Sequence, residues 1–254
     1  MESSADMSSS VPGGHGLKAV IFDLDGVVAN THPIHLQAWK AFLSEQGLDL
    51  PDVDLSFLYA GRSRKDILHH YLGPLEDRKS DSLGRRKDEL YRSLAFNLQP
   101  EPELLRVLDE LDSAGIPFAL ATSAGRVRTV ETLQKFQIAD RFAAVVTGQD
   151  VRAPKPDPEI FLLAASKLGI APRECLVVED SRAGVEAARA AGMKCLGYAP
   201  PERVSDLLVA AADDVVSQFP QPALEHFARL FEVGYVSEDS PPHGRSDGTV
   251  IRGA

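Results

Sequence analysis

Short, almost uninterrupted apolar runs recur along the middle of this chain, and segments with helical patterning separate them. The four strongest runs are residues 18–22, 118–121, 143–146 and 175–178, and two weaker ones are residues 194–197 and 214–216. Strands that are apolar on both faces must be covered on both faces, which is typical of a parallel sheet. Helical patterns occupy residues 127–136, 158–168 and 183–191. Repeated strand–helix units therefore predict a doubly wound, Rossmann-like α/β core whose functional site lies at the carboxyl ends of the strands.

One long interval interrupts this alternation. Residues 33–99 have a helical pattern throughout, with Leu36, Trp39 and Leu43 at helical spacing. We interpret this interval as a small helical cap domain, inserted directly after the first strand and placed over the site. The core domain then comprises residues 17–32 and 100–232. The two ends have little apolar content, so residues 1–16 and 233–254 are expected to be disordered tails.

The charge balance limits the partners of the chain and differs between its parts. The formal net charge is −10, which disfavours nucleic acid and anionic membrane surfaces as partners. Residues 62–92 are an exception, since nine basic and six acidic residues give this stretch of the cap about +3. Either these side chains form a solvated helix face, or a few of them bind an anionic substrate.

The cysteines and the apolar runs indicate a cellular compartment. The two cysteines, Cys175 and Cys195, lie in strand-like runs and are interpreted as free core thiols in a reducing environment. The apolar runs are far too short to span a bilayer, and the first residues show no secretory signal. We therefore expect a cytoplasmic protein, a monomer, without a membrane partner.

The first predicted strand ends in Asp23-Leu24-Asp25-Gly26. Side chains two residues apart share one side of an extended chain, so the two aspartates should point together. Two carboxylates at close range raise each other's pKa, and a metal ion or a shared proton would relieve the repulsion. Gly26 permits a sharp turn and a close approach of a ligand to the backbone. The alternative interpretation is an ordinary turn followed by a helix cap.

Three more polar clusters follow later strands. They are Thr122-Ser123, Lys155 between two prolines, and Glu179-Asp180-Ser181. Each has an ordinary alternative, since hydroxyl and acidic residues commonly cap helices and most lysines lie at the surface. Hydroxyl and backbone N–H groups suit phosphate oxygens, whereas a strand that ends in two acids needs a compensating cation. Together with the aspartate pair, these clusters at one sheet edge predict a Mg²⁺ site with a phosphate beside it.

In this order the four clusters resemble the haloacid dehalogenase superfamily of aspartate-dependent phosphotransferases, over residues 17–232. Three segments are similar to its β-phosphoglucomutase-like subfamily: His35-Leu36-Gln37-Ala38-Trp39, Gly61-Arg62-Ser63-Arg64 and residues 177–185. The resemblance implies that Asp23 is the nucleophile and that Asp25 is the general acid and base. It also implies a Mg²⁺ ion held by Asp23, the Asp25 backbone carbonyl and Asp180, with Glu179 close behind.

The same resemblance assigns the remaining site residues. Thr122, Ser123 and Lys155 would stabilise charge on the transferring phosphoryl group. The cap residues expected near the substrate are His35, Gly61, Ser63, Arg64 and Lys87. The chain departs from the subfamily at Asn30, where an aspartate is usual, and at Arg62, which adds a charge near the expected specificity loop. Asn30 bears on the geometry of the cap hinge, and Arg62 on substrate preference.

These roles predict phosphoryl transfer on a small sugar phosphate, in the manner of the mutases that interconvert β-glucose 1-phosphate and glucose 6-phosphate. A sugar-phosphate phosphatase is the main alternative, since water could attack the same aspartyl-phosphate. His35, Arg64 and Lys87 favour the mutase, because a second phosphate needs its own cationic site. A receiver-like signalling domain is a remote alternative, because its phosphorylated aspartate follows a later strand. A catalytically inactive binding protein is disfavoured too, since every core group is present.

Overall fold

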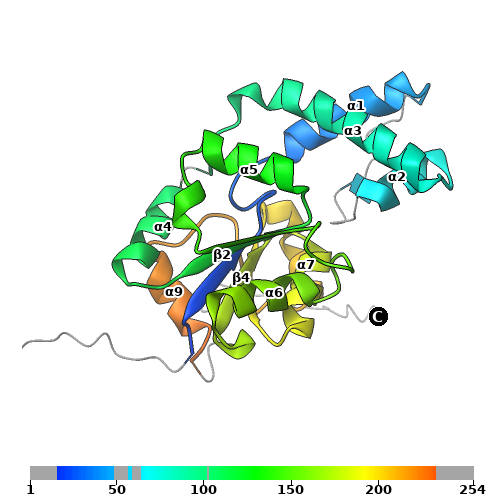
Figure 1. Ribbon diagram of the computed structural model, residues 1–254. Coiled ribbons are helices and arrows are strands. Elements are labelled where there is room, and N and C mark those ends of the chain that lie inside the picture. The colour runs from blue at the N-terminus through cyan, green and yellow to red at the C-terminus, as the bar shows by residue number, and fades with distance from the viewer. Residues whose placement is uncertain (1–15, 49–56, 59–63, 102, 233–254) are drawn as a thin grey trace, which may run out of the picture.

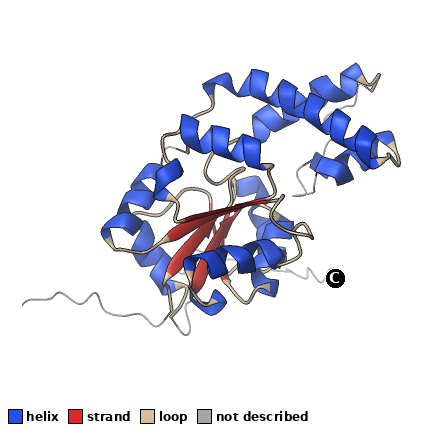
Figure 2. Cartoon of the chain, in the orientation of Figure 1, coloured by secondary structure: helices blue, strands red, loops and turns tan. Residues whose placement is uncertain are grey.

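The computed structural model describes residues 16–48, 57–58, 64–101 and 103–232. Its centre is a six-stranded sheet in the order β3-β2-β1-β4-β5-β6, with every neighbouring pair parallel (Figure 2). The strands are β1 (Ala19–Phe22), β2 (Phe118–Thr122), β3 (Ala144–Thr147), β4 (Cys175–Glu179), β5 (Lys194–Tyr198) and β6 (Asp214–Val216). All six predicted strands are confirmed, with boundaries within one residue of those expected.

Both faces of this sheet are buried, which explains why its strands are almost continuously apolar. Val20 and Phe22 of β1 belong to the core on one face, and Ala19 and Ile21 belong to the core on the other. The first face is covered by α4 (Leu104–Ser113), α5 (Arg126–Lys135) and α9 (Ala223–Arg229). The second face is covered by α6 (Glu159–Leu168), α7 (Arg182–Ala190) and α8 (Val204–Val209). The architecture is therefore the doubly wound α/β sandwich that the sequence predicts (Figure 1).

A helical cap is inserted between β1 and α4, as expected. It contains α1 (His32–Glu45), α2 (Arg64–Leu72), α3 (Asp77–Leu94) and the short 3₁₀ helix η2 (Ala95–Asn97). The cap has its own hydrophobic core, in which Trp39 and Phe42 of α1 pack with Leu68 of α2 and Leu83 of α3. Figure 1 shows these helices at one end of the sheet, away from the bulk of the core. Two separate apolar cores allow the cap and the sheet to pack independently.

Several sequence predictions concern residues outside the described ranges. Both predicted tails lie there, apart from residue 16, and so do Gly61, Arg62 and Ser63. The division into core and cap at residues 32/33 and 99/100 stays a prediction, although α1 begins at His32. Both cysteines are buried and free, as expected. Within the described part of the chain, no helix combines the length and apolar character needed to cross a membrane.

Candidate active site

The four predicted polar clusters converge on one cavity of about 1060 Å³ between the sheet and the cap. Its core side contains Asp23, Asp25, Thr122, Ser123, Lys155, Glu179, Asp180 and Ser181, and its cap side contains His35, Trp39, Arg64, Lys65, Lys87 and Asp88. The core residues come from the ends of β1, β2 and β4 and from the loop after β3. They meet because parallel strands present their carboxyl ends at the same edge of the sheet. The predicted juxtaposition is therefore present among the described residues.

Lys155 is the central cation of the core side. Its Nζ lies 2.6 Å from Asp23 Oδ1 and 2.5 Å from Glu179 Oε1, and all three residues are at most 6% exposed. The surface-lysine alternative is therefore wrong here. Burial raises the pKa of Asp23, and although Lys155 opposes this, neighbouring carboxylates bring the pKa to about 8. The pKa of Lys155 is raised as well, because its two carboxylate partners outweigh the effect of burial. The lysine therefore remains charged between two acids.

Glycines permit the close packing of these acids. Gly26 has a φ of +84°, and a Cβ there would lie 2.5 Å from Asp180 Oδ2. Gly184 lies in α7, where a Cβ would come within 1.9 Å of the Glu179 carboxyl group. Ser181 caps this helix, since its Oγ accepts a hydrogen bond from the Gly184 N–H. The helix-capping alternative is thus correct for Ser181. This N-cap bond of α7 also fixes the position of the acidic end of β4.

Asp25 lies in the same cavity but has different partners. Arg128 of α5 donates two hydrogen bonds to its carboxylate, from Nη2 to Oδ2 at 2.5 Å and from Nη1 to Oδ1 at 2.7 Å. Thr31 Oγ1 donates a third, at 2.6 Å to Oδ1. Burial favours the neutral acid, yet the Arg128 guanidinium and His35 hold the pKa of Asp25 well below its usual range. Adjacent aspartates thus occupy opposite electrostatic environments.

Thr122 and Ser123 end β2 without capping the helix that follows. Thr122 is buried, and its Oγ1 accepts a hydrogen bond from the Ala124 N–H at 3.1 Å. Ser123 is exposed in the cavity wall, and α5 begins after Gly125 with no side-chain cap. The first N–H of α5, that of Arg126, donates instead to Gln149 Oε1 at 3.0 Å, and Ser123, Gly125 and Arg126 line the cavity that also contains Lys155. This arrangement suits a phosphate oxygen.

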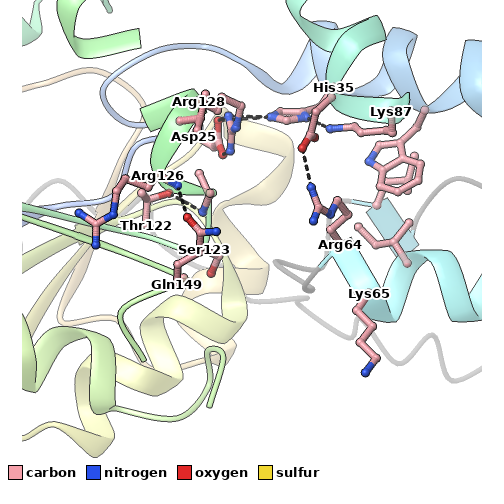
Figure 3. Close-up of a pocket in the computed structure, with 18 of the residues that line it drawn as sticks. Asp25, His35, Arg64, Lys65, Lys87, Thr122, Ser123, Arg126, Arg128 and Gln149 are labelled. Atoms are coloured by element: carbon pink, nitrogen blue, oxygen red, sulfur yellow. Dashed lines mark hydrogen bonds and ion pairs between the residues drawn. The ribbon is translucent and has the colours of Figure 1, made fainter. Parts of the chain in front are cut away.

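On the cap side, three predicted residues lie together (Figure 3). His35 Nδ1 lies 2.8 Å from Lys87 Nζ, and the His35 ring stacks on Tyr91 at 4.3 Å between centroids. Arg64 Nη1 pairs with Asp88 at 2.5 Å. Burial and the neighbouring Lys87 lower the pKa of His35 to about 3, so the imidazole is neutral at neutral pH. The cationic character of this wall therefore comes from Arg64 and Lys87.

Both interpretations of the basic stretch 62–92 apply, to different side chains. Arg86 pairs with Glu45 at 2.6 Å and with Glu89 at 3.0 Å, all at exposed positions outside the cavity. These pairs form the solvated helix face. Lys87 is only 4% exposed and faces the cavity. Periodicity alone does not distinguish it from its neighbours, because the distinction arises from how α3 packs on α1.

The structure adds three site residues that the sequence analysis missed. Arg128 pairs with Asp25, while His32 Nε2 lies 2.5 Å from Asp180 Oδ2, and Arg203 donates to the Asp180 backbone carbonyl at 2.8 Å. Their partners lie 103, 148 and 23 residues away in sequence. Such pairs leave no local pattern in a single sequence.

The acidic residues fit a divalent cation by their chemistry. The pKa of Asp23 is raised by burial and by the carboxylates of Glu179, Asp25 and Asp180 although Lys155 opposes this, so the single ammonium does not balance the acids gathered here. Within the described ranges, no three His, Cys, Asp or Glu side chains form a metal cluster as they stand. Mg²⁺ commonly uses one or two carboxylates, with waters and phosphate oxygens completing its shell. Asp23 and Asp180, with a backbone carbonyl, provide that type of donor set. Glu179 already bonds Lys155 and Ser181.

Comparison with known proteins places this geometry in a family. A model of haloacid dehalogenase-like hydrolases matches residues 20–198, which is most of the chain, so the protein belongs to this family. It is an enzyme of the phosphotransferase class within the haloacid dehalogenase superfamily, and its relatives place it in the β-phosphoglucomutase-like subfamily.

Individual relatives support this assignment. The chain is 34% identical to a β-phosphoglucomutase of Bacillus subtilis over 223 residues, covering 83% of this chain and 97% of the relative. It is 33% identical to a phosphorylated carbohydrates phosphatase of Thermotoga maritima, covering 70% and 83%. Among solved structures, a haloacid dehalogenase hydrolase of Entamoeba histolytica superposes with a TM-score of 0.78 at 26% identity, covering 85% and 99%.

Proposed function

We propose that the protein transfers a phosphoryl group of a small sugar phosphate through an aspartyl-phosphate at Asp23, with Mg²⁺ as cofactor. The observation that carries this proposal is the contrast between two aspartates in one cavity. Asp23 is buried against Lys155, whereas Asp25 is held by Arg128 and Thr31. One carboxylate is thus placed beside a phosphate-binding cation, and the other faces the cap. The roles of nucleophile for Asp23 and of general acid and base for Asp25 further require that bound Mg²⁺ lower the raised pKa of Asp23 and that Asp25 take up a proton when it leaves Arg128.

The proposed reaction has two steps. In the first, an Asp23 oxygen attacks phosphorus, the bond from phosphorus to the sugar oxygen breaks, and Asp25, which has taken up a proton from solvent on leaving Arg128, gives that proton to the sugar oxygen. In the second, a hydroxyl attacks the aspartyl-phosphate, its proton passes to Asp25, and Asp23 is released. Lys155, the Thr122 hydroxyl and the Ser123 N–H stabilise charge on the phosphoryl oxygens. Bound Mg²⁺ would supply further positive charge beside Asp23 and Asp180.

The identity of the attacking hydroxyl separates a mutase from a phosphatase. A mutase that interconverts β-glucose 1-phosphate and glucose 6-phosphate must hold a bisphosphate and exclude water, whereas a phosphatase admits water. Arg64 and Lys87 line the cap wall of the cavity and provide positive charge for a second phosphate, which favours the mutase. The phosphatase is the second candidate because relatives of comparable identity carry both kinds of name.

Phosphorus NMR tests the proposal directly. Purified protein is incubated with Mg²⁺, β-glucose 1-phosphate and a trace of the 1,6-bisphosphate. Formation of glucose 6-phosphate without inorganic phosphate supports the mutase, whereas release of inorganic phosphate supports the phosphatase. An Asp23→Asn variant should be folded and inactive in both reactions, because a carboxamide does not attack phosphorus. Wild-type activity in that variant would exclude Asp23 as the nucleophile.

A further inference from the structure

Arg128 is the core residue that connects the proposed acid and base with the cap. It lies in the first turn of α5, its side chain is 13% exposed, and it lines the cavity. Besides its two bonds to Asp25, its Nη1 lies 3.1 Å from His35 Nε2 in the cap. Its guanidinium also lies over the Tyr91 ring of α3, 5.2 Å from the centroid. Figure 3 shows Arg128 and Asp25 facing His35, with Lys87 beyond it.

The partners of Arg128 must change when substrate binds. In the proposed reaction Asp25 exchanges a proton with a substrate oxygen, so one of its carboxylate oxygens must become accessible to that oxygen. Both oxygens now accept hydrogen bonds from Arg128, and Oδ1 also accepts one from Thr31. A guanidinium that gives up such a bond in a nearly enclosed site needs another acceptor, because an unpaired buried cation is costly.

Among the described residues, the other protein groups in contact with Arg128 provide no second anion. Its other described contacts are the neutral His35 imidazole and the ring and hydroxyl of Tyr91, none of which is an anion at neutral pH. The nearby charged groups of the cap wall include Lys87 and Arg64, and Arg64 already pairs with Asp88. A region with several cations and few free carboxylates attracts an anion. The acceptor is therefore expected to come from the ligand.

We propose that Arg128 is a specificity-determining residue that exchanges its bond to Asp25 for the phosphate group of the sugar phosphate remote from Asp23. This inference rests on the proposed function, because Asp23 defines which phosphate reacts. The exchange frees an oxygen of Asp25 as the second phosphate enters. Binding of that phosphate at the remote site is therefore coupled to the release of Asp25 from Arg128. The planar guanidinium can bind two oxygens of that phosphate, as it now binds two of Asp25.

Calorimetric binding to catalytically blocked protein tests this role. The background is Asp23→Asn with Mg²⁺, and the two probes are glucose 1,6-bisphosphate and phenyl phosphate, which has no second anionic group. Adding Arg128→Met should weaken bisphosphate binding by about tenfold to a hundredfold, the loss expected for charge-assisted hydrogen bonds. Phenyl phosphate binding should remain nearly unchanged. Arg141→Met is the matched control, because Arg141 pairs with Asp112 outside the cavity.

Every outcome decides the proposal. Equal weakening for both probes would mean that Arg128 acts only through Asp25, and unchanged binding of both would remove it from the site. Arg128→Lys keeps the charge but not the two-pronged geometry, so it should cause an intermediate loss of bisphosphate affinity. If Arg128→Met fails to fold, this variant provides the test in its place. Failure of the proposed function is recognised separately, as wild-type protein that transfers no phosphoryl group in the NMR assay.

Discussion

Lys87 is predicted to lower the stability of the protein in exchange for a cation in the cavity. It is 4% exposed, its Nζ lies 2.8 Å from His35, and the ammonium lies 5.2 Å from the centroid of the Trp39 ring. Burial and the nearby Arg128 lower its pKa from 10.5 to about 7. Substituting Lys87→Met removes the buried charge and retains most of the apolar side chain. We expect the variant to be more stable than the wild type at neutral pH and to bind sugar phosphates more weakly.

The magnitude follows from the pKa of Lys87. Each pKa unit corresponds to about 1.4 kcal/mol, so a fall from 10.5 to about 7 sets an upper bound of about 5 kcal/mol. The variant loses the contact with His35 and the attraction to the aromatic rings, which together offset about 2 kcal/mol. A net gain of about 1–3 kcal/mol in the free energy of unfolding is therefore expected at pH 7 and below. Between pH 7 and 10.5 the unfolded chain binds a proton that the folded chain lacks, so the wild type becomes more stable relative to the variant as pH rises.

Urea unfolding at pH 6.5 and pH 9.5 measures this difference. The advantage of Lys87→Met should be large at the lower pH and should shrink or vanish at the higher one. Asp23, whose pKa is about 8, titrates in both proteins, so its contribution cancels in the comparison. Lys79→Met, at an exposed position of α3, is the control and should show no such pH dependence. A Lys87→Met variant that is less stable than the wild type at both pH values would refute this reasoning.

Three further substitutions test the core and the cap. Gly184→Ala places a Cβ 1.9 Å from the Glu179 carboxyl group and should destabilise the fold by about 2–3 kcal/mol. Gly125→Ala is the control and should change the stability little, because a Cβ there meets open space. Similar thermal unfolding of both variants would contradict this packing. Lys155→Met leaves two buried carboxylates without their cation and should cost about 3–5 kcal/mol in urea unfolding at pH 8. A loss below about 1 kcal/mol, the size typical of an exposed pair, would argue against the buried geometry. Arg64→Ala should impair isomerisation of a sugar monophosphate more than hydrolysis of a small phosphate ester, and equal losses in the two assays would exclude a role in holding the remote phosphate.

The sheet and its acidic edge could be predicted because their signals are local. A strand between two layers of helices must be apolar on both faces, so residues 18–22 and 175–178 are visible as strands without any partner. The parallel topology then brings the ends of these strands to one edge, which places Asp23 near Glu179 although the chain between them is long. Hydrophobic patterning therefore located the core half of the site.

The cap half of the site required the tertiary structure. Lys87 and Arg86 are adjacent basic residues of α3, yet Lys87 is buried against His35 while Arg86 pairs with Glu45 on the surface. Which side of a charged helix faces inward depends on the helix that packs against it. A run of charged residues has no apolar periodicity that would mark the buried side.

Sequence alone thus determined the fold class, the strand ends and the residue types of the proposed phosphoryl-transfer centre, because the apolar pattern of a buried strand is visible in the few residues that form it. Only the tertiary structure decided that Arg128 holds Asp25 and that His32 contacts Asp180. These are single ion pairs between distant segments, and their geometry depends on how α1 and α5 sit over the ends of the strands. An arginine in a helix has the same sequence signature whether it points to water or to a carboxylate, so packing alone sets its role.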